Sequence, residues 1–152
     1  MIIYLDNCCY NRPFDDQSSI SIKIESEAKL YIQDEIRNSR LELVWSYALD
    51  YENSKNPHKD RFNSILVWKF LSNYDVIETP DIIRRAKEYM DKGLKMYDSL
   101  HIACAVGSKC DYFITTDKFI INKSDLIKDV AIINPVNFVT IHERENENRH
   151  RN

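Results

Sequence analysis

The sequence is poor in glycine and contains only two, Gly93 and Gly107. Loops that cradle phosphate groups need glycines at fixed spacing, because the backbone must approach the ligand closely there. Neither a P-loop nor a dinucleotide-binding fingerprint is therefore present. Both glycines instead lie where predicted helices end, a position that favours this residue.

The chain also lacks an excess of basic residues, with 21 Lys and Arg against 24 Asp and Glu and a formal net charge of −3. A strongly basic balance would indicate nucleic-acid binding through neutralisation of phosphates. Any action on nucleic acid must therefore depend on a local group of cations.

Long apolar runs are absent as well. The longest ones, such as Ile2–Leu5 and Ile65–Val67, are far too short to span a membrane. The N-terminal residues lack the basic region and the long apolar stretch of a signal peptide. We therefore expect a cytoplasmic protein with no membrane contact.

Cysteine occurs four times, with no paired spacing of the kind that binds zinc. Two of the cysteines are adjacent in sequence and cannot easily bridge each other. We expect all of them to be buried free thiols in a reducing compartment. They are Cys8, Cys9, Cys104 and Cys110.

Predicted strands alternate with predicted helices along one domain-sized chain of 152 residues. Strands are predicted at Ile2–Leu5, Leu41–Trp45, Tyr74–Ile77, Tyr112–Thr115 and Val130–Ile133. The main helices are predicted at 18–39, 46–53, 60–71, 80–92 and 97–106. This alternation indicates an α/β fold with a mostly parallel sheet. We expect one domain over residues 1–142 and a charged, frayed tail over 143–152.

Carboxylates occur close to the predicted strand ends. Asp6 directly follows the first strand, and Asp117 follows the fourth by two residues. Glu52 lies in the helix after the second strand, and Asp98 lies near the start of the helix that precedes the fourth. Since functional groups of such sheets gather beyond the carboxyl ends of the strands, all four can converge there.

Several carboxylates close together repel one another and would partly protonate unless a cation joins them. Mg²⁺ or Mn²⁺ prefers oxygen ligands and would resolve that conflict. Such a site suits phosphodiester hydrolysis, because the metal activates water and neutralises charge on the phosphate. Taken alone, Asp98 or Asp117 could equally be a helix cap or a turn residue. The prediction of a metal site therefore depends on all four acids together.

Four segments of the chain resemble the motifs of PIN-domain ribonucleases, in the same order. They are Ile3–Cys9, Ser46–Glu52, Tyr97–Ala105 and Asp111–Asp117. Ile132–Pro135 is similar to the last strand of that family. The resemblance implies a single PIN-like domain, a three-layer α/β/α fold with a mostly parallel central sheet.

The resemblance also implies a function, an endoribonuclease that hydrolyses RNA with Mg²⁺ or Mn²⁺. Asp6, Glu52, Asp98 and Asp117 would hold the metal and form the catalytic site. Thr115 would support the cluster by hydrogen bonding. Asn7, which stands where the family usually has threonine or serine, would support it too.

Small single-domain PIN proteins resemble VapC-type toxins, which cut RNA and are held inactive by a small antitoxin. The resemblance therefore implies an antitoxin partner and the toxin role in a type II toxin–antitoxin pair, and it leaves a homodimer open. We expect single-stranded or loop RNA as substrate, because duplex phosphates are held in a rigid A-form geometry.

Two assignments near the site stay open. Asp50 precedes Glu52 by two residues, and residues so spaced face different sides of a helix, so only one can join the cluster. We prefer Glu52, which lies next to a polar turn. His101, one turn after Asp98, could touch the site or be a partly buried helix residue.

RNA contacts are predicted at Arg12 and at a local basic group made of Lys55, Lys59 and Arg61. Arg12 could instead pair with a neighbouring aspartate. The alternative function is a catalytically silent PIN-like binding or scaffold module. Degenerate members of that kind lose acids from the cluster, whereas all four positions are acidic here.

Overall fold

The computed structural model describes all 152 residues and contains a five-stranded sheet in which every neighbouring pair of strands is parallel. The strand order is β3-β2-β1-β4-β5. The strands are β1 (Ile2–Leu5), β2 (Glu42–Ser46), β3 (Tyr74–Val76), β4 (Tyr112–Ile114) and β5 (Ala131–Ile133). The α/β fold with a parallel sheet is therefore confirmed.

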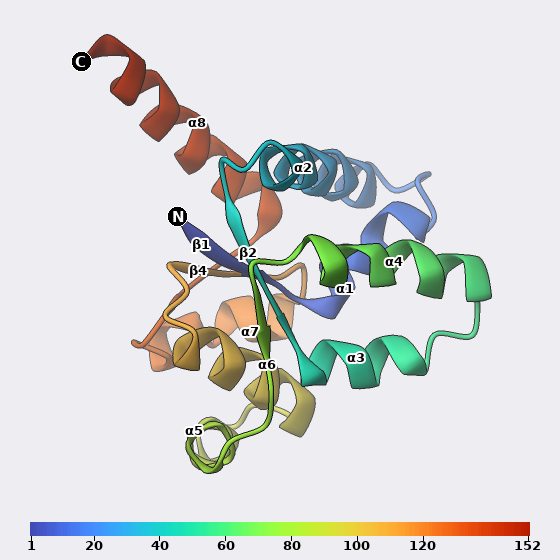
Figure 1. The fold of residues 1–152 in the computed structure, drawn as a ribbon, viewed down its shortest axis with the longest axis vertical. Helices are drawn as coiled ribbons and strands as arrows, with labels where there is room; N and C mark the ends of the chain where they lie inside the picture. The colour runs from blue at the N-terminus through green and yellow to red at the C-terminus, as the bar shows by residue number, and fades with distance from the viewer.

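Helices cover both faces of this sheet (Figure 1). They are α1 (Asn7–Asn11), α2 (Ile20–Arg37), α3 (Tyr47–Ser54), α4 (Lys59–Leu71), α5 (Pro80–Asp91), α6 (Met96–Gly107), α7 (Lys118–Asn122) and α8 (Pro135–Arg151). Two short 3₁₀ helices, η1 (Arg12–Phe14) and η2 (Ser124–Leu126), complete the chain. In Figure 1, α2 and α4 lie on one side of the sheet and α5 and α6 on the other, which gives three layers. None of these helices combines the length and the apolar character needed to cross a membrane.

The helix boundaries follow local chemistry that the sequence displays. Ser46 and Thr79 cap α3 and α5, and their hydroxyls accept hydrogen bonds from backbone N–H groups at 3.3 and 3.2 Å. Pro80 occupies the first turn of α5, where its missing N–H costs nothing. Gly93, just after α5, has φ of +97°, a conformation that strains other residues.

The core is built around β1. Ile3, Tyr4 and Leu5 are all fully buried, as expected for a strand covered on both faces of a parallel sheet. The cysteines form no disulfides; three are buried, and Cys8 is half-buried.

Two short helices, α1 and α7, were not expected from the sequence. Each has five residues and begins directly after a carboxylate that caps it. Asp6 accepts a hydrogen bond from the Asn7 backbone N–H, and Asp117 accepts one from that of Phe119. Five residues are too few for a helical pattern of apolar side chains to be recognised.

The structure also differs from the expected frayed tail. Helix α8, which was not expected from the sequence, begins at Pro135 and continues through Arg151, and Figure 1 shows its last turns extending away from the sheet. The packed part of α8 ends near His142, which is buried, whereas residues 147–152 are exposed. Arg and Glu are good helix formers, so the helix can continue without further packing. The boundary of the domain at residue 142 stays a prediction.

Candidate active site

Asp6 lies where β1 ends, with only 5% of its surface exposed. One carboxylate oxygen accepts the Asn7 backbone N–H at 2.8 Å, and the other accepts the Thr115 hydroxyl at 2.8 Å. The Cys8 thiol also donates to this second oxygen, at 3.4 Å. Burial raises the pKa of Asp6, although the charge of His101 and the Thr115 hydrogen bond oppose that rise.

Thr115 links the first and last acids of the cluster. Besides donating to Asp6, its hydroxyl oxygen accepts the backbone N–H of Asp117 at 3.1 Å. It can do so because β4, which ends at Ile114, is the direct neighbour of β1 in the sheet. Asp117 is half-buried at the start of α7.

Glu52 is held by a fully buried histidine. The Nε2 atom of His101, on α6, lies 2.7 Å from a carboxylate oxygen of Glu52, on α3. Its other ring nitrogen, Nδ1, lies 2.6 Å from the hydroxyl of Tyr4, which in turn lies 2.6 Å from the hydroxyl of Ser46. This buried chain of hydrogen bonds fixes α3 and α6 against β1 and β2.

His101 and Glu52 each shift the pKa of the other in the direction that favours its charged form. Burial acts to lower the pKa of His101, but the hydrogen bond to Glu52 and the charge of Asp6 raise it overall. Burial acts to raise the pKa of Glu52, but His101 lowers it overall, and Asn7 and Lys55 act in the same direction.

Asp98, near the start of α6, completes the group. Its pKa is raised to about 6, first by partial burial and then by repulsion from Asp6 and Asp117, with a smaller contribution from Glu52. Asp98 therefore lies close enough to the other three predicted acids to be affected by their charges. We refer to Asp6, Glu52, Asp98 and Asp117 as the acidic cluster.

The donors of the acidic cluster fit a hard divalent cation, because they are all carboxylate oxygens. The mutual repulsion at Asp98 is the conflict that such an ion would relieve. In addition, the side-chain oxygen of Asn7 is buried and has no hydrogen-bond partner. However, no three His, Cys, Asp or Glu side chains lie close enough together to hold a metal ion in this structure.

The alternative acid, Asp50, has other partners. It accepts the indole N–H of Trp45 at 3.0 Å and forms an ion pair with Lys69 at 3.0 Å. The structure thus brings Glu52 to His101 and the other acids, and it holds Asp50 against α4.

The cations that were predicted to contact RNA have different contacts in the structure. Arg12 forms ion pairs with Asp15 and Glu25, at 3.2 and 2.9 Å, which is the alternative considered for it. Arg61 stacks on the ring of Phe14 and donates to the Phe14 carbonyl. Lys59 is exposed at the start of α4.

Lys55 alone among these cations influences the acidic cluster, and its charge helps lower the pKa of Glu52. It lies over two tyrosine rings, Tyr51 and Tyr97, each adjacent in sequence to one of the acids. Sequence reasoning gave neither tyrosine a role at the site, and it also missed Tyr4. A signal for Tyr4 existed, since a tyrosine inside a buried strand needs a partner for its hydroxyl.

Comparison with known proteins identifies the family. The family model of the PIN domain matches residues 8–125, most of the chain. The chain therefore belongs to the PIN-domain family. No curated protein sequence matches the chain.

Solved structures with the same fold include two described as VapBC. The chain is similar to a structure of VapBC2 from Rickettsia felis bound to a DNA fragment from their promoter, with 16% identity and a TM-score of 0.55 over 88% of this chain and 98% of that one. It is also similar to VapBC-1 from nontypeable Haemophilus influenzae, with 15% identity and a TM-score of 0.58 over 89% of this chain and 98% of that one. The chain therefore shares its overall fold with both of these structures.

Proposed function

We propose that this protein is an endoribonuclease that hydrolyses RNA phosphodiester bonds with Mg²⁺ or Mn²⁺. Membership of the PIN-domain family supports a nuclease. The observation that carries the proposal is the placement of the acids at the carboxyl end of the sheet. Thr115 joins Asp6 to Asp117 through hydrogen bonds, and His101 holds Glu52. Burial and the neighbouring acids also raise the pKa of Asp98. A cluster of negative charge with a single histidine at its base has no evident structural benefit.

In this proposal the acidic cluster would hold the ion. When bound, a divalent ion supplies an activated water and neutralises charge on the phosphate. The protein's own part is to fix the ligands in place. Thr115 and the start of α1 orient Asp6, and the hydrogen-bond chain through Tyr4 and His101 orients Glu52. Such supporting contacts commonly account for a substantial part of metal affinity.

The protein would also be the toxin of a toxin–antitoxin pair, inhibited by a small antitoxin protein, and it would act in the cytoplasm. The two VapBC structures support this role, because they share the fold over nearly their whole chains. Expression of this chain should stop bacterial growth, and co-expression with the protein of the adjacent gene should restore it. Growth arrest by Asp6→Asn as well would contradict a toxic nuclease activity.

The nuclease activity is tested with a labelled RNA hairpin incubated in Mg²⁺ or Mn²⁺. We expect cleavage in the single-stranded loop, no cleavage in EDTA, and none by Asp6→Asn. Binding of the RNA without cleavage in either metal would instead favour the scaffold function. Cleavage that persists in EDTA would exclude the proposed metal mechanism.

A further inference from the structure

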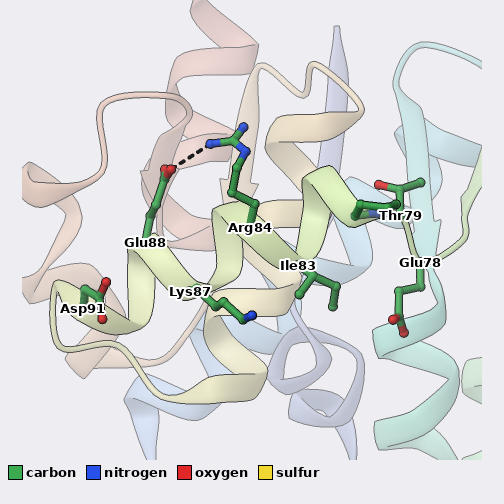
Figure 2. Close-up of a pocket in the computed structure, with 8 residues that line it drawn as sticks. Glu78, Thr79, Ile83, Arg84, Lys87, Glu88 and Asp91 are labelled. Atoms are coloured by element: carbon green, nitrogen blue, oxygen red, sulfur yellow. Dashed lines mark hydrogen bonds and ion pairs between the residues drawn. The ribbon is translucent and has the colours of Figure 1, made fainter.

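A cavity of about 250 Å³ lies between the two helices that carry Glu52 and Asp98, α3 and α6. Its walls come from α3, from α6 and from the segment between β3 and α5. The lining residues are Tyr47, Ala48, Tyr51, Glu78, Tyr97 and Leu100. Figure 2 shows the side chain of Glu78 beside α3, at the far end of the α5 surface from Glu88 and Asp91. We call this cavity the tyrosine pocket.

Two tyrosine rings form one wall of the tyrosine pocket. The rings of Tyr51 and Tyr97 are stacked, with centroids 5.3 Å apart and planes inclined by 24°. Each directly precedes an acid of the cluster in sequence, because Tyr51 is followed by Glu52 and Tyr97 is followed by Asp98. Tyr51 is 45% exposed, so part of its side chain is accessible to a ligand.

A cation lies at the same place. The ammonium nitrogen of Lys55 is 4.2 Å from the ring centre of Tyr51 and 5.3 Å from that of Tyr97. Aromatic rings with an adjacent cation are how proteins commonly bind single-stranded nucleic acid, where the rings stack on bases and the cation neutralises phosphate. The tyrosine pocket offers both, on the two helices that carry Glu52 and Asp98.

We propose that the tyrosine pocket binds one unpaired nucleobase of the RNA, beside the phosphate to be cleaved. The proposal deepens the proposed nuclease function and rests on it. The cavity volume of about 250 Å³ equals that of roughly eight water molecules in the liquid, which is enough room for one planar nucleobase. A base can enter only when it is unpaired, so the pocket would also select loops and single strands over duplex.

Glu78 gives the pocket a means of distinguishing bases. Its side chain is exposed and forms no ion pair, and a carboxylate can only accept hydrogen bonds when ionised. Cytosine, adenine and guanine carry amino groups that can donate to it, whereas uracil presents carbonyl oxygens on either side of its single N–H. We therefore expect uridine to be the least favoured base at this position.

The test measures binding of a labelled single-stranded RNA in EDTA, where cleavage is prevented, together with cleavage in Mn²⁺. Tyr51→Leu should weaken binding by about fivefold to a hundredfold, the usual effect of losing one stacked base. Tyr51→Phe keeps the ring and should bind like wild type. Tyr74→Leu is the matched control, because Tyr74 is 43% exposed but lies on the edge strand β3, outside the pocket.

Base preference is measured with oligonucleotides that differ only in the nucleotide next to the cleaved bond. Wild type should disfavour uridine there, and Glu78→Gln should reduce that discrimination, because an amide can also donate to a carbonyl oxygen. Equal loss of binding in Tyr51→Leu and Tyr51→Phe would contradict a stacking role.

Failure of this inference can be separated from failure of the nuclease. If wild type cleaves RNA while Tyr51→Leu binds and cleaves equally well, the base pocket is overturned and the site suits an apolar side chain of a protein partner. If wild type binds RNA in a Tyr51-dependent way but never cleaves it, the nuclease proposal fails, whereas the proposal that the tyrosine pocket binds a nucleobase is supported. Absence of any RNA binding by wild type would overturn the pocket.

Discussion

The molecule contains two pairs in which a buried histidine contacts a glutamate, and the pairs differ in what surrounds them. His142 of α8 lies 3.0 Å from Glu35 of α2, and Arg40 donates to both oxygens of that glutamate at 2.9 and 3.0 Å. His101 lies 2.7 Å from Glu52, but the nearby charges that act on it are further acids, Asp6 and Asp98. The first pair is neutralised, whereas the second lies in excess negative charge.

That difference separates a structural contact from a candidate site. The hydrogen bond from Arg40 is the largest influence lowering the pKa of Glu35, so the pair is satisfied by the protein itself. At Asp98, in contrast, burial and neighbouring acids raise the pKa to about 6. Unresolved electrostatic conflict of this kind is typical of functional sites.

The largest expected effect is on catalysis. Glu52→Gln should reduce RNA cleavage by about a hundredfold or more, the usual effect of removing one electrostatic group from an active site. Glu35→Gln, its matched counterpart, should leave cleavage rates unchanged in folded protein. It should lower the free energy of unfolding by about 1–3 kcal/mol, because a charged hydrogen-bond network is weakened. Urea unfolding and a cleavage assay on both variants would reveal any reversal of this pattern.

Asp50 provides a second control for Glu52. Asp50→Asn should retain most cleavage activity, because Asp50 contacts Trp45 and Lys69 rather than the acidic cluster. Its loss should lower the free energy of unfolding by less than about 1 kcal/mol, since the ion pair is partly exposed. Initial cleavage rates decide the question, and an inactive Asp50→Asn beside an active Glu52→Gln would mean that the two roles are exchanged.

Removing the charge of Asp98 should change stability in the opposite direction from removing that of Glu35. In metal-free protein the raised pKa of Asp98 means that the folded state binds the proton more tightly than the unfolded state does. The contribution of Asp98 to stability is therefore fully present below the usual carboxyl pKa and is lost as pH rises through about 6. Asp98→Asn should raise the free energy of unfolding near neutral pH by about 1–2 kcal/mol, a value reduced for solvent screening of a half-exposed group.

The measurement is urea unfolding in EDTA at pH 7 and at pH 4, because the benefit of Asp98→Asn should vanish at the lower pH. Glu35→Gln should destabilise the protein at pH 7. If both variants destabilised the metal-free protein at pH 7 to a similar extent, the contrast between the two regions would be false.

The smallest expected effect concerns salt. Each phosphate contact with single-stranded RNA contributes about 0.7 to the slope of log affinity against log salt. Lys55→Ala should reduce that slope by about one contact, because Lys55 lies close enough to Glu52 to affect its pKa. Arg61→Ala should change the slope little, because Arg61 contacts Phe14 instead. Binding titrations at several salt concentrations provide the slopes, and the opposite ranking would relocate the RNA path toward α4.

Much of the fold could be predicted from the sequence because its signals are local. The apolar run before Asp6 indicated a strand buried on both faces, and Ser46 and Thr79 indicated helix starts. Helices α1 and α7 could not be predicted, because each is one short turn fixed by its capping carboxylate and its packing.

The site was harder to predict than the fold, since its contacts join residues far apart in the chain. The link from Tyr4 through His101 to Glu52 depends on how α6 packs against β1, which no local pattern contains. The ion pair that holds Arg12 to Glu25 depends likewise on the position of α2.

The central claim, that the acidic cluster binds a divalent cation, is tested most directly by calorimetric titration with Mn²⁺. Wild type and Glu35→Gln should bind one or two ions with similar affinity, because the second pair lies outside the site. Asp6→Asn should bind markedly more weakly, since it loses a buried carboxylate ligand. Equal Mn²⁺ binding by wild type and Asp6→Asn would contradict the claim.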